Sequence, residues 1–192
     1  NVAKLANQVI VALNIAAVWE LPVLFVIENN GYGLSTPTNE QYRCENLADK
    51  GVGYGMESHV VDGNNLLEVV HLISELKASM VENPRPVLLE FKTFRMRGHE
   101  EASGTKYVPQ ELMDMWAVKD PVENYRNYLK ATAVLSEEED EAIRAEIKKE
   151  IDTDWAKVQE EPEIVASLKE ELGDVYQPYE FEAFNPSSEV EN

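Results

Sequence analysis

The first half of the sequence alternates between helical and strand-like hydrophobic patterns. Residues 2–19 are rich in Ala, Leu, Ile and Val on nearly all sides of a helix, which predicts a helix buried between layers. Residues 23–27 form an unbroken apolar run, which is typical of a central strand in a parallel sheet. Residues 59–62 and 86–94 predict two further strands, and the apolar spacing between them predicts a helix capped by Asn64. This alternation predicts an α/β fold with a doubly wound, mostly parallel sheet.

The pattern changes after residue 108. Residues 109–159 carry helix-capping signals such as Asp120-Pro121 and an apolar stripe at steps of four, so they predict a helical extension. Residues 160–192 are rich in Pro and Glu with scattered aromatic side chains, which predicts an extended acidic tail or linker. We therefore expect three parts, with an α/β domain at 1–108 followed by the helical extension and the tail.

The chain is strongly acidic. It has 36 acidic and 17 basic side chains, a net charge of −19, and residues 136–192 alone hold 19 of the acids and 5 of the bases. Nucleic acids and anionic membranes require a dense cationic surface, so we expect neither as a partner. The single cysteine, Cys44, excludes an internal disulfide and indicates a reducing compartment, which predicts a cytoplasmic location.

A polar segment, Glu-Asn-Asn-Gly-Tyr-Gly at residues 28–33, follows the first predicted strand. Ligands of open α/β sheets bind beyond the carboxyl ends of the strands. Amide and carbonyl oxygens suit Mg²⁺, which takes its remaining ligands from water and substrate phosphate. Asn and Gly also favour turns by themselves, so a simple turn is the alternative interpretation.

A basic segment, Arg-Met-Arg-Gly-His at residues 95–99, follows the last predicted strand. Arg95 and Arg97 offer fixed positive charge, Gly98 allows close approach of the backbone, and His99 offers a side chain of the type that titrates near neutral pH. These residue types predict a polyanion pocket. Two surface arginines and a capping histidine remain the alternative.

Several segments together resemble a known enzyme family. ENNGYGLSTPTNEQ, GYGMESHVVDGNN, RPVLLEFKTFRMRGHEEASG and KDPVENY are similar to the α part of thiamine-diphosphate-dependent 2-oxo acid dehydrogenases, the decarboxylating component of the pyruvate and branched-chain complexes. The similarity runs from about residue 12 to residue 129, and the tail is similar to the joint of chains in which the α and β parts are fused. The resemblance implies the thiamine-diphosphate-binding fold and the cofactors thiamine diphosphate and Mg²⁺.

The resemblance also implies roles for individual residues. It assigns Asn30 and the carbonyl of Tyr32 to the metal, and the family register places Asn1 at its third metal ligand. It assigns Arg95 and His99 to the diphosphate, with His99 also assisting acyl transfer to a lipoyl group. Two further residues belong to the implied cofactor-binding set, Gly31 and Leu34. Glu100 stands where mammalian relatives carry a regulatory serine.

The implied partners are the β part of the enzyme, a lipoyl-bearing acyltransferase core and a second copy of the chain, so we expect exposed apolar surface. Asn1 and Val2 stand where the family has the Asp and second Gly of a Gly-Asp-Gly turn, and an amide lacks the charge of that Asp. The N-terminal half of the family and the β part are also absent from this sequence. We therefore expect a part of an enzyme that is inactive by itself. The alternatives are the α part of an acetoin dehydrogenase and a truncated, non-catalytic interaction module.

Overall fold

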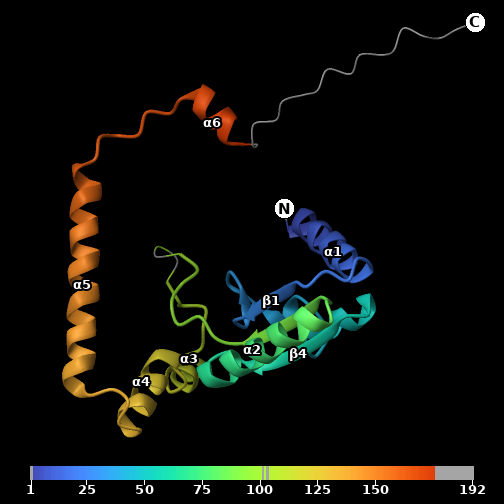
Figure 1. Cartoon of the computed structure of the whole chain (residues 1–192), viewed down its shortest axis with the longest axis horizontal. Helices are drawn as coiled ribbons and strands as arrows, with labels where there is room; N and C mark the ends of the chain where they lie inside the picture. Colours follow the sequence, from blue (N-terminus) through green and yellow to red (C-terminus); the bar gives the residue numbers. More distant parts are fainter. Residues whose placement is uncertain (1, 101, 103, 176–192) are drawn as a thin grey trace, which may run out of the picture. The chain divides into compact units, whose positions relative to one another are not determined.

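The computed structural model describes residues 2–100, 102 and 104–175, with the side chains of residues 2–7 excepted. The chain divides into two compact units, Asn1–Ser136 and Glu137–Asn192. The elements of the first unit are, in chain order, α1 (Val2–Val18), β1 (Leu24–Asn29), β2 (Tyr32–Gly33), β3 (Thr36–Pro37), the 3-10 helices η1 (Thr38–Glu40) and η2 (Leu47–Tyr54), β4 (Glu57–Asp62), α2 (Leu66–Glu82), β5 (Val87–Lys92), α3 (Gln110–Ala117) and α4 (Pro121–Ala131) (Figure 1). The second unit contains α5 (Glu137–Glu160) and α6 (Leu168–Asp174).

The main sheet of the first unit has three described strands, in the order β1-β5-β4, and both pairings are parallel. The register pairs Asn29 with Lys92 and Asp62 with Lys92, so the three strands end together at one edge. The strand predicted at 23–27 is present, but it continues to Asn29 and lies at the side of the described sheet. The expectation of a central position is therefore wrong for β1, because β5 occupies the centre.

Helices cover both faces of β5. On one face Val87 and Leu89, both fully buried, pack with Leu76 and Met80 of α2. On the other face Leu88 forms a second buried cluster, whose other members are Leu13 and Met56. The alternation of side chains along a strand explains why consecutive residues of β5 serve two cores. The α/β class and the parallel sheet predicted from the sequence are confirmed.

The helix α1 is less buried than its composition predicts. Between Gln8 and Val18 only Leu13 and Ala16 are buried, whereas Val11 is 55% exposed and Val18 is 70% exposed. The prediction of a helix buried between layers is wrong for the described part of this chain. The structure leaves an exposed apolar surface on this helix, as the resemblance led us to expect.

The cap of α2 is Asn65 rather than Asn64. The side chain of Asn65 accepts a hydrogen bond from the amide of Glu68. Asn64 instead accepts from the Thr93 hydroxyl at 2.8 Å and donates to the Lys119 carbonyl at 2.8 Å. Asn64 thereby connects the end of β5 to the segment before α4. No local sequence pattern predicts this contact.

The C-terminal segment also differs from the prediction where the structure describes it. The sequence predicts an extended chain over 160–192, but Leu168–Asp174 forms the helix α6, and Ser167 caps it by accepting from the Glu170 amide. Residues 176–192 lie outside the described residues. Within the described part of the chain, no helix combines the length and apolar character needed to cross a membrane.

A carboxylate at the amino end of β4 lies in an ion-pair cluster. Glu57 Oε2 lies 2.6 Å from Arg85 Nε, and Glu57 Oε1 lies 2.7 Å from His59 Nε2. Burial acts to raise the pKa of Glu57. The hydrogen bonds and positive charge from His59 and Arg85 outweigh burial, so the pKa lies below its usual value.

This lowered pKa predicts an acid-dependent contribution to stability. Because the folded pKa of Glu57 lies below the ordinary value of 4.5, its contribution is present above that value and is lost as pH falls through the folded pKa. We expect Glu57→Gln to lower the free energy of unfolding by roughly 0.5–1 kcal/mol at pH 7, since the pair is partly solvated. Urea unfolding at pH 7 and pH 3 measures the difference, which should shrink at the lower pH. A constant difference would contradict the assignment.

Candidate functional site

Two successive Asn side chains shape the loop that follows β1. Asn29 Oδ1 accepts a hydrogen bond from the Gly31 amide at 3.2 Å, and Asn30 Oδ1 accepts from the Tyr32 amide at 3.0 Å. Gly31 has a φ of 81°, a left-handed conformation that glycine adopts without strain. The Asn-Asn-Gly segment is thus a pair of side-chain-closed turns. The turn predicted as the alternative interpretation is present, and it orders the residues predicted to bind the metal.

The loop continues into a small antiparallel hairpin that the sequence reading missed. Strand β2 pairs with β3 through Tyr32↔Pro37, and the Thr38 amide donates to the Gly31 carbonyl at 3.0 Å. The hairpin turns through Leu34, which has a φ of 59°. Tight hairpin turns normally signal themselves by Asn-Gly or Gly-X. Leu34-Ser35 carries no such signal, so the local sequence did not reveal the hairpin.

The arginine at the end of the β5 segment connects the two predicted loops. Arg95 Nη2 donates to the Leu34 carbonyl at 2.9 Å and to the Tyr107 hydroxyl at 3.3 Å. Arg95 Nη1 lies 3.2 Å from His99 Nδ1. One guanidinium therefore contacts the loop after β1, the loop after β5 and the histidine that the sequence singled out.

Aromatic side chains pack beside this arginine. The ring of Tyr32 meets Tyr107 edge-on, with centroids 5.7 Å apart, and it meets Phe94 edge-on at 6.3 Å. Phe94 in turn stacks on Trp116 of α3 at 5.5 Å. These contacts give the polar loops an apolar support and connect them to α3.

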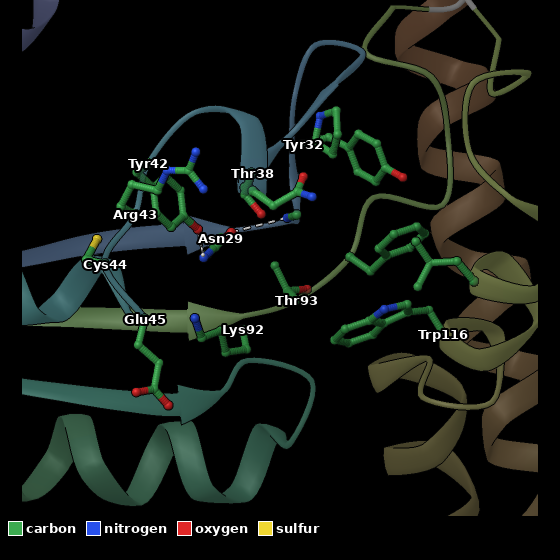
Figure 2. A pocket seen from close by; sticks show the side chains of 15 residues that line it. Asn29, Tyr32, Thr38, Tyr42, Arg43, Cys44, Glu45, Lys92, Thr93 and Trp116 are labelled. Carbon is green, nitrogen blue, oxygen red and sulfur yellow. Dashed lines mark hydrogen bonds between the residues drawn. The ribbon is translucent and has the colours of Figure 1, made fainter.

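A cavity of about 590 Å³ opens at the same edge of the sheet, between the hairpin, the end of β5 and α3 (Figure 2). Asn29, Lys92 and Thr93 come from the strand ends, and Trp116 comes from α3. The remaining side of the cavity is lined mainly by the segment after β3, including Thr38, Tyr42, Arg43 and Cys44. Amides, hydroxyls and cationic groups therefore share the lining with aromatic surface, which suits a polar organic ligand.

A buried carboxylate lies under this cavity. Glu90, in the middle of β5, is fully buried. Its Oε1 accepts from Asn29 Nδ2 at 2.6 Å and from Lys92 Nζ at 2.5 Å, and its Oε2 accepts from the Ala48 amide at 2.8 Å. Burial acts to raise the pKa of Glu90. The three hydrogen bonds and the positive charge of Lys92 outweigh burial, so the pKa is held below its usual value.

The structure brings most of the predicted site residues to one edge of the sheet. Asn30 and Tyr32 share the loop after β1, and Arg95 links that loop to His99. Asn1 lies outside the described residues. Gly98 packs against its own loop, because a Cβ there would lie 2.7 Å from the Gly104 carbonyl oxygen. The predicted cofactor residues that this edge gathers are Asn30, Gly31, Leu34, Arg95 and His99.

The sequence reading missed Glu90, Lys92 and Tyr42. A Glu inside an otherwise apolar strand is the signal that could have revealed the first of them, because a buried carboxylate requires partners. Across the residues that the structure describes, no cluster of three or more His, Cys, Asp or Glu side chains is arranged to hold a metal.

Comparison with known proteins agrees with this arrangement. The sequence profile described as "Dehydrogenase E1 component" matches residues 3–167. The chain belongs to the dehydrogenase E1 component family. The resemblance to 2-oxo acid dehydrogenase α subunits is thereby confirmed, and both predicted loops lie within the matched segment.

Individual dehydrogenase E1 relatives are similar over most of this chain. It is 36% identical to 2-oxoisovalerate dehydrogenase subunit alpha 2 of Arabidopsis thaliana, over 73% of the chain and 30% of the relative. It is 36% identical to 2-oxoisovalerate dehydrogenase subunit alpha of Bacillus subtilis, over 70% of the chain and 41% of the relative. It is also 36% identical to 3-methyl-2-oxobutanoate dehydrogenase subunit alpha of Mycobacterium tuberculosis, over 71% and 38%. The aligned region thus spans less than half of each relative.

The contacts of Arg95 predict how the loop after β5 is held. We expect Arg95→Met to release that loop, because it removes the donors to Leu34 and Tyr107. Chymotrypsin cleavage after Tyr107, followed by mass spectrometry, should accelerate roughly fivefold or more, as expected for the loss of charged hydrogen bonds. The matched control is Arg43→Met, since Arg43 is exposed and the described contacts provide it with no hydrogen bond or ion pair. Equal acceleration in both variants would contradict the role of Arg95.

Proposed function

We propose that this chain is the thiamine-diphosphate- and magnesium-anchoring part of the decarboxylating component of a 2-oxo acid dehydrogenase. The contact that carries the proposal is Arg95, whose guanidinium joins the loop after β1 to His99 in a chain of the dehydrogenase E1 family. In this proposal the sheet is part of a doubly wound thiamine-diphosphate-binding fold. Residues 1–108 form the cofactor domain, 109–159 the helical extension and 160–192 the acidic tail or linker.

The magnesium ligands in this proposal are Asn30 Oδ1, the Tyr32 carbonyl and Asn1. Among the contacts of the described residues, Asn30 Oδ1 accepts one hydrogen bond, from the Tyr32 amide, which leaves its second lone pair for a cation. Amide and carbonyl oxygens are hard ligands, and Mg²⁺ completes its octahedron with water and phosphate oxygens. The donor set present at this edge thus fits a magnesium diphosphate.

The diphosphate residues in this proposal are Arg95 and His99, with Gly31 and Leu34 beside them. Arg95 supplies a planar cation of the kind that recognises phosphate oxygens. A Cβ built on Gly31 would meet nothing within 4 Å, so the space beside this residue is open for a ligand. His99 contacts Arg95 through Nδ1, and within the described part of the chain its Nε2 makes no hydrogen bond.

The cofactor supplies the electron sink for decarboxylation of the 2-oxo acid. The residues of this chain then have three tasks. Asn30 and Tyr32 hold the metal, and Arg95 orients the diphosphate between the two loops. His99 is the catalytic residue of the proposal and holds a proton near the acyl group during its transfer to the lipoyl group of the acyltransferase core.

The names of the relatives favour one substrate class. The Arabidopsis, Bacillus and Mycobacterium relatives are named for 2-oxoisovalerate or its synonym 3-methyl-2-oxobutanoate, which are branched 2-oxo acids. We therefore propose branched-chain 2-oxo acids ahead of pyruvate. Oxidation of acetoin is the enzymatic alternative, and a comparison of acetoin with 2-oxoisovalerate in the assembled enzyme distinguishes them. A cytoplasmic location stays a prediction.

The exposed surface of α1 supports a partner. Val9, Ile10, Val18 and Trp19 are each at least half exposed, which is costly for a surface in water. We propose that the β part of the enzyme and a second copy of the chain cover such surfaces in an α2β2-like particle.

The proposal predicts a weak, local interaction of this chain with magnesium thiamine diphosphate. We expect NMR titration to shift the amides of Gly31, Tyr32 and His99 with a Kd of about 1 mM or weaker, because the complete site includes the β part. Asn30→Ala and His99→Ala should each weaken the interaction by roughly tenfold.

The control is Asn83→Ala, which makes the same substitution at the C-cap of α2, before β5 and away from its carboxyl end. Magnesium alone and thiamine without phosphate serve as ligand controls. The absence of any shift at these amides at concentrations of roughly 10 mM would contradict cofactor anchoring and favour a non-catalytic interaction module.

A further inference from the structure

We propose that Glu90 is a positioning residue. Its buried carboxylate orients the side-chain amide of Asn29 and, through Asn29, the backbone of the loop that contains the proposed metal ligands Asn30 and Tyr32. This inference rests on the proposed function, because it concerns the loop that contains Asn30 and Tyr32. It assigns a task to a charged side chain that touches neither the metal nor the diphosphate in the proposed mechanism.

The burial of Glu90 requires an explanation. A carboxylate in the centre of a sheet loses its hydration, and this loss is tolerated only where hydrogen bonds and an opposite charge replace the water. Glu90 is fully buried and shares its face of β5 with Leu88, which belongs to the second core cluster. Its three partners are Lys92 on the same strand, the Ala48 amide of η2 and Asn29 at the end of β1. Of these, only Asn29 leads directly into the loop of the candidate site, because it is the last residue of β1.

The chemistry of a carboxylate determines the orientation of the Asn29 side chain. An ionised carboxylate accepts hydrogen bonds and donates none, so it must face the NH2 end of an amide. Asn29 Nδ2 accordingly donates to Glu90 Oε1 at 2.6 Å and to the Tyr42 hydroxyl at 3.0 Å. Asn29 Oδ1 is thereby directed toward the Gly31 amide at 3.2 Å. A flipped amide would lose this bond and place two donors against each other.

The orientation of Asn29 in turn holds the backbone of the loop. The bond from the Gly31 amide to Asn29 Oδ1 closes the first turn, in which Gly31 takes its left-handed conformation. The Gly31 carbonyl accepts from Thr38, and the next amide, Tyr32, closes the second turn on Asn30. The Asn29 carbonyl accepts from the Thr93 amide at 3.0 Å, which ties the same residue to the segment after β5. Preorganisation of this kind reduces the ordering cost when a ligand binds.

The decisive experiment exchanges the amide and the carboxylate. In Glu90→Gln, the new side chain can keep an acceptor toward Ala48 only by presenting its NH2 group to Asn29. In the double variant N29D/E90Q, the side-chain NH2 group at position 90 donates to the carboxylate at position 29. The pairing of an amide with a carboxylate is thereby restored with the two groups exchanged. The carboxylate introduced at position 29 can accept from Gly31 and pair with Lys92, its neighbour in the strand register. The matched control is Glu57→Gln, which neutralises another ion-paired carboxylate of the same sheet at its opposite end.

The first readout is the hydrogen-exchange rate of the Gly31 amide in the full chain, measured by NMR against the core amides of β5. We expect Glu90→Gln to accelerate exchange at Gly31 by about threefold to tenfold, the range expected for the loss of one hydrogen bond. The double variant should return the rate to near that of the wild type, and Glu57→Gln should leave it unchanged. If the charge of Glu90 had a purely structural role, the double variant would not restore the hydrogen-exchange rate of Gly31.

The second readout is the Kd for magnesium thiamine diphosphate, with Mg²⁺ and thiamine diphosphate as the probe. We expect Glu90→Gln to weaken binding by roughly the same factor as it accelerates exchange, and the double variant to restore it. If the wild type binds no cofactor, the proposed function fails, while the exchange rates still decide whether Glu90 orders the loop.

Three results would overturn the inference. Unchanged exchange at Gly31 in a folded Glu90→Gln variant would show that the loop does not depend on this carboxylate. Accelerated exchange that the double variant does not reverse would show that Glu90 does not act through Asn29. If Glu90→Gln fails to fold, the hydrogen-exchange rate of Gly31 is compared between N29D/E90Q and Asn29→Asp. In that case, a double variant whose Gly31 amide is not protected from exchange would refute the proposal.

Discussion

The parallel pairing of β1, β5 and β4 is the constraint on which the remainder of the site depends. Parallel strands in register end at the same edge, and the pairing of Asn29 with Lys92 brings two loops that are far apart in the sequence to one place. The Thr93 amide donates to the Asn29 carbonyl, and Arg95 completes the connection through the Leu34 carbonyl. The residues of the candidate site thus gather where the sheet ends.

The central strand serves both the stability and the chemistry of this sheet. Val87 and Leu89 face one core and Leu88 faces the other, so β5 depends on helices from both sides. Glu90 interrupts this apolar run, and its partners Asn29 and Lys92 lie at the edge that bears the cavity. A buried charge, which is costly unless it is paired, therefore lies next to the loop of the candidate site.

The proposed function gives these local features of a dehydrogenase E1 chain a common purpose. The asparagines of the loop after β1 offer oxygen ligands, whereas the segment after β5 offers cationic groups, and a magnesium diphosphate needs both. The apolar side chains of Val18, at the end of α1, and of Trp19, directly after it, are exposed in this chain. The proposed sharing of the site between subunits accounts for the presence of ordered polar loops together with uncovered apolar surface on one chain.

Local patterns were sufficient for the helices and strands of the main sheet and for the residues of both loops. Apolar runs and Asn-Gly or Arg-Gly-His segments report the conformation and chemistry of a few neighbouring residues, which depend mainly on local sequence. The hairpin at Leu34 was not predicted, because its turn lacks the Asn-Gly or Gly-X residues that usually mark a tight hairpin. Tertiary contacts decided the order of the strands, the exposure of α1, the cap at Asn65 and the partners of Glu90. An apolar run such as residues 23–27 is compatible with a central or a lateral strand. A Glu such as Glu90 is compatible with exposure to water or with a buried hydrogen-bond network. Only contacts between residues far apart in the chain distinguish these possibilities, because the free energy of a strand or a charge depends on what packs against it.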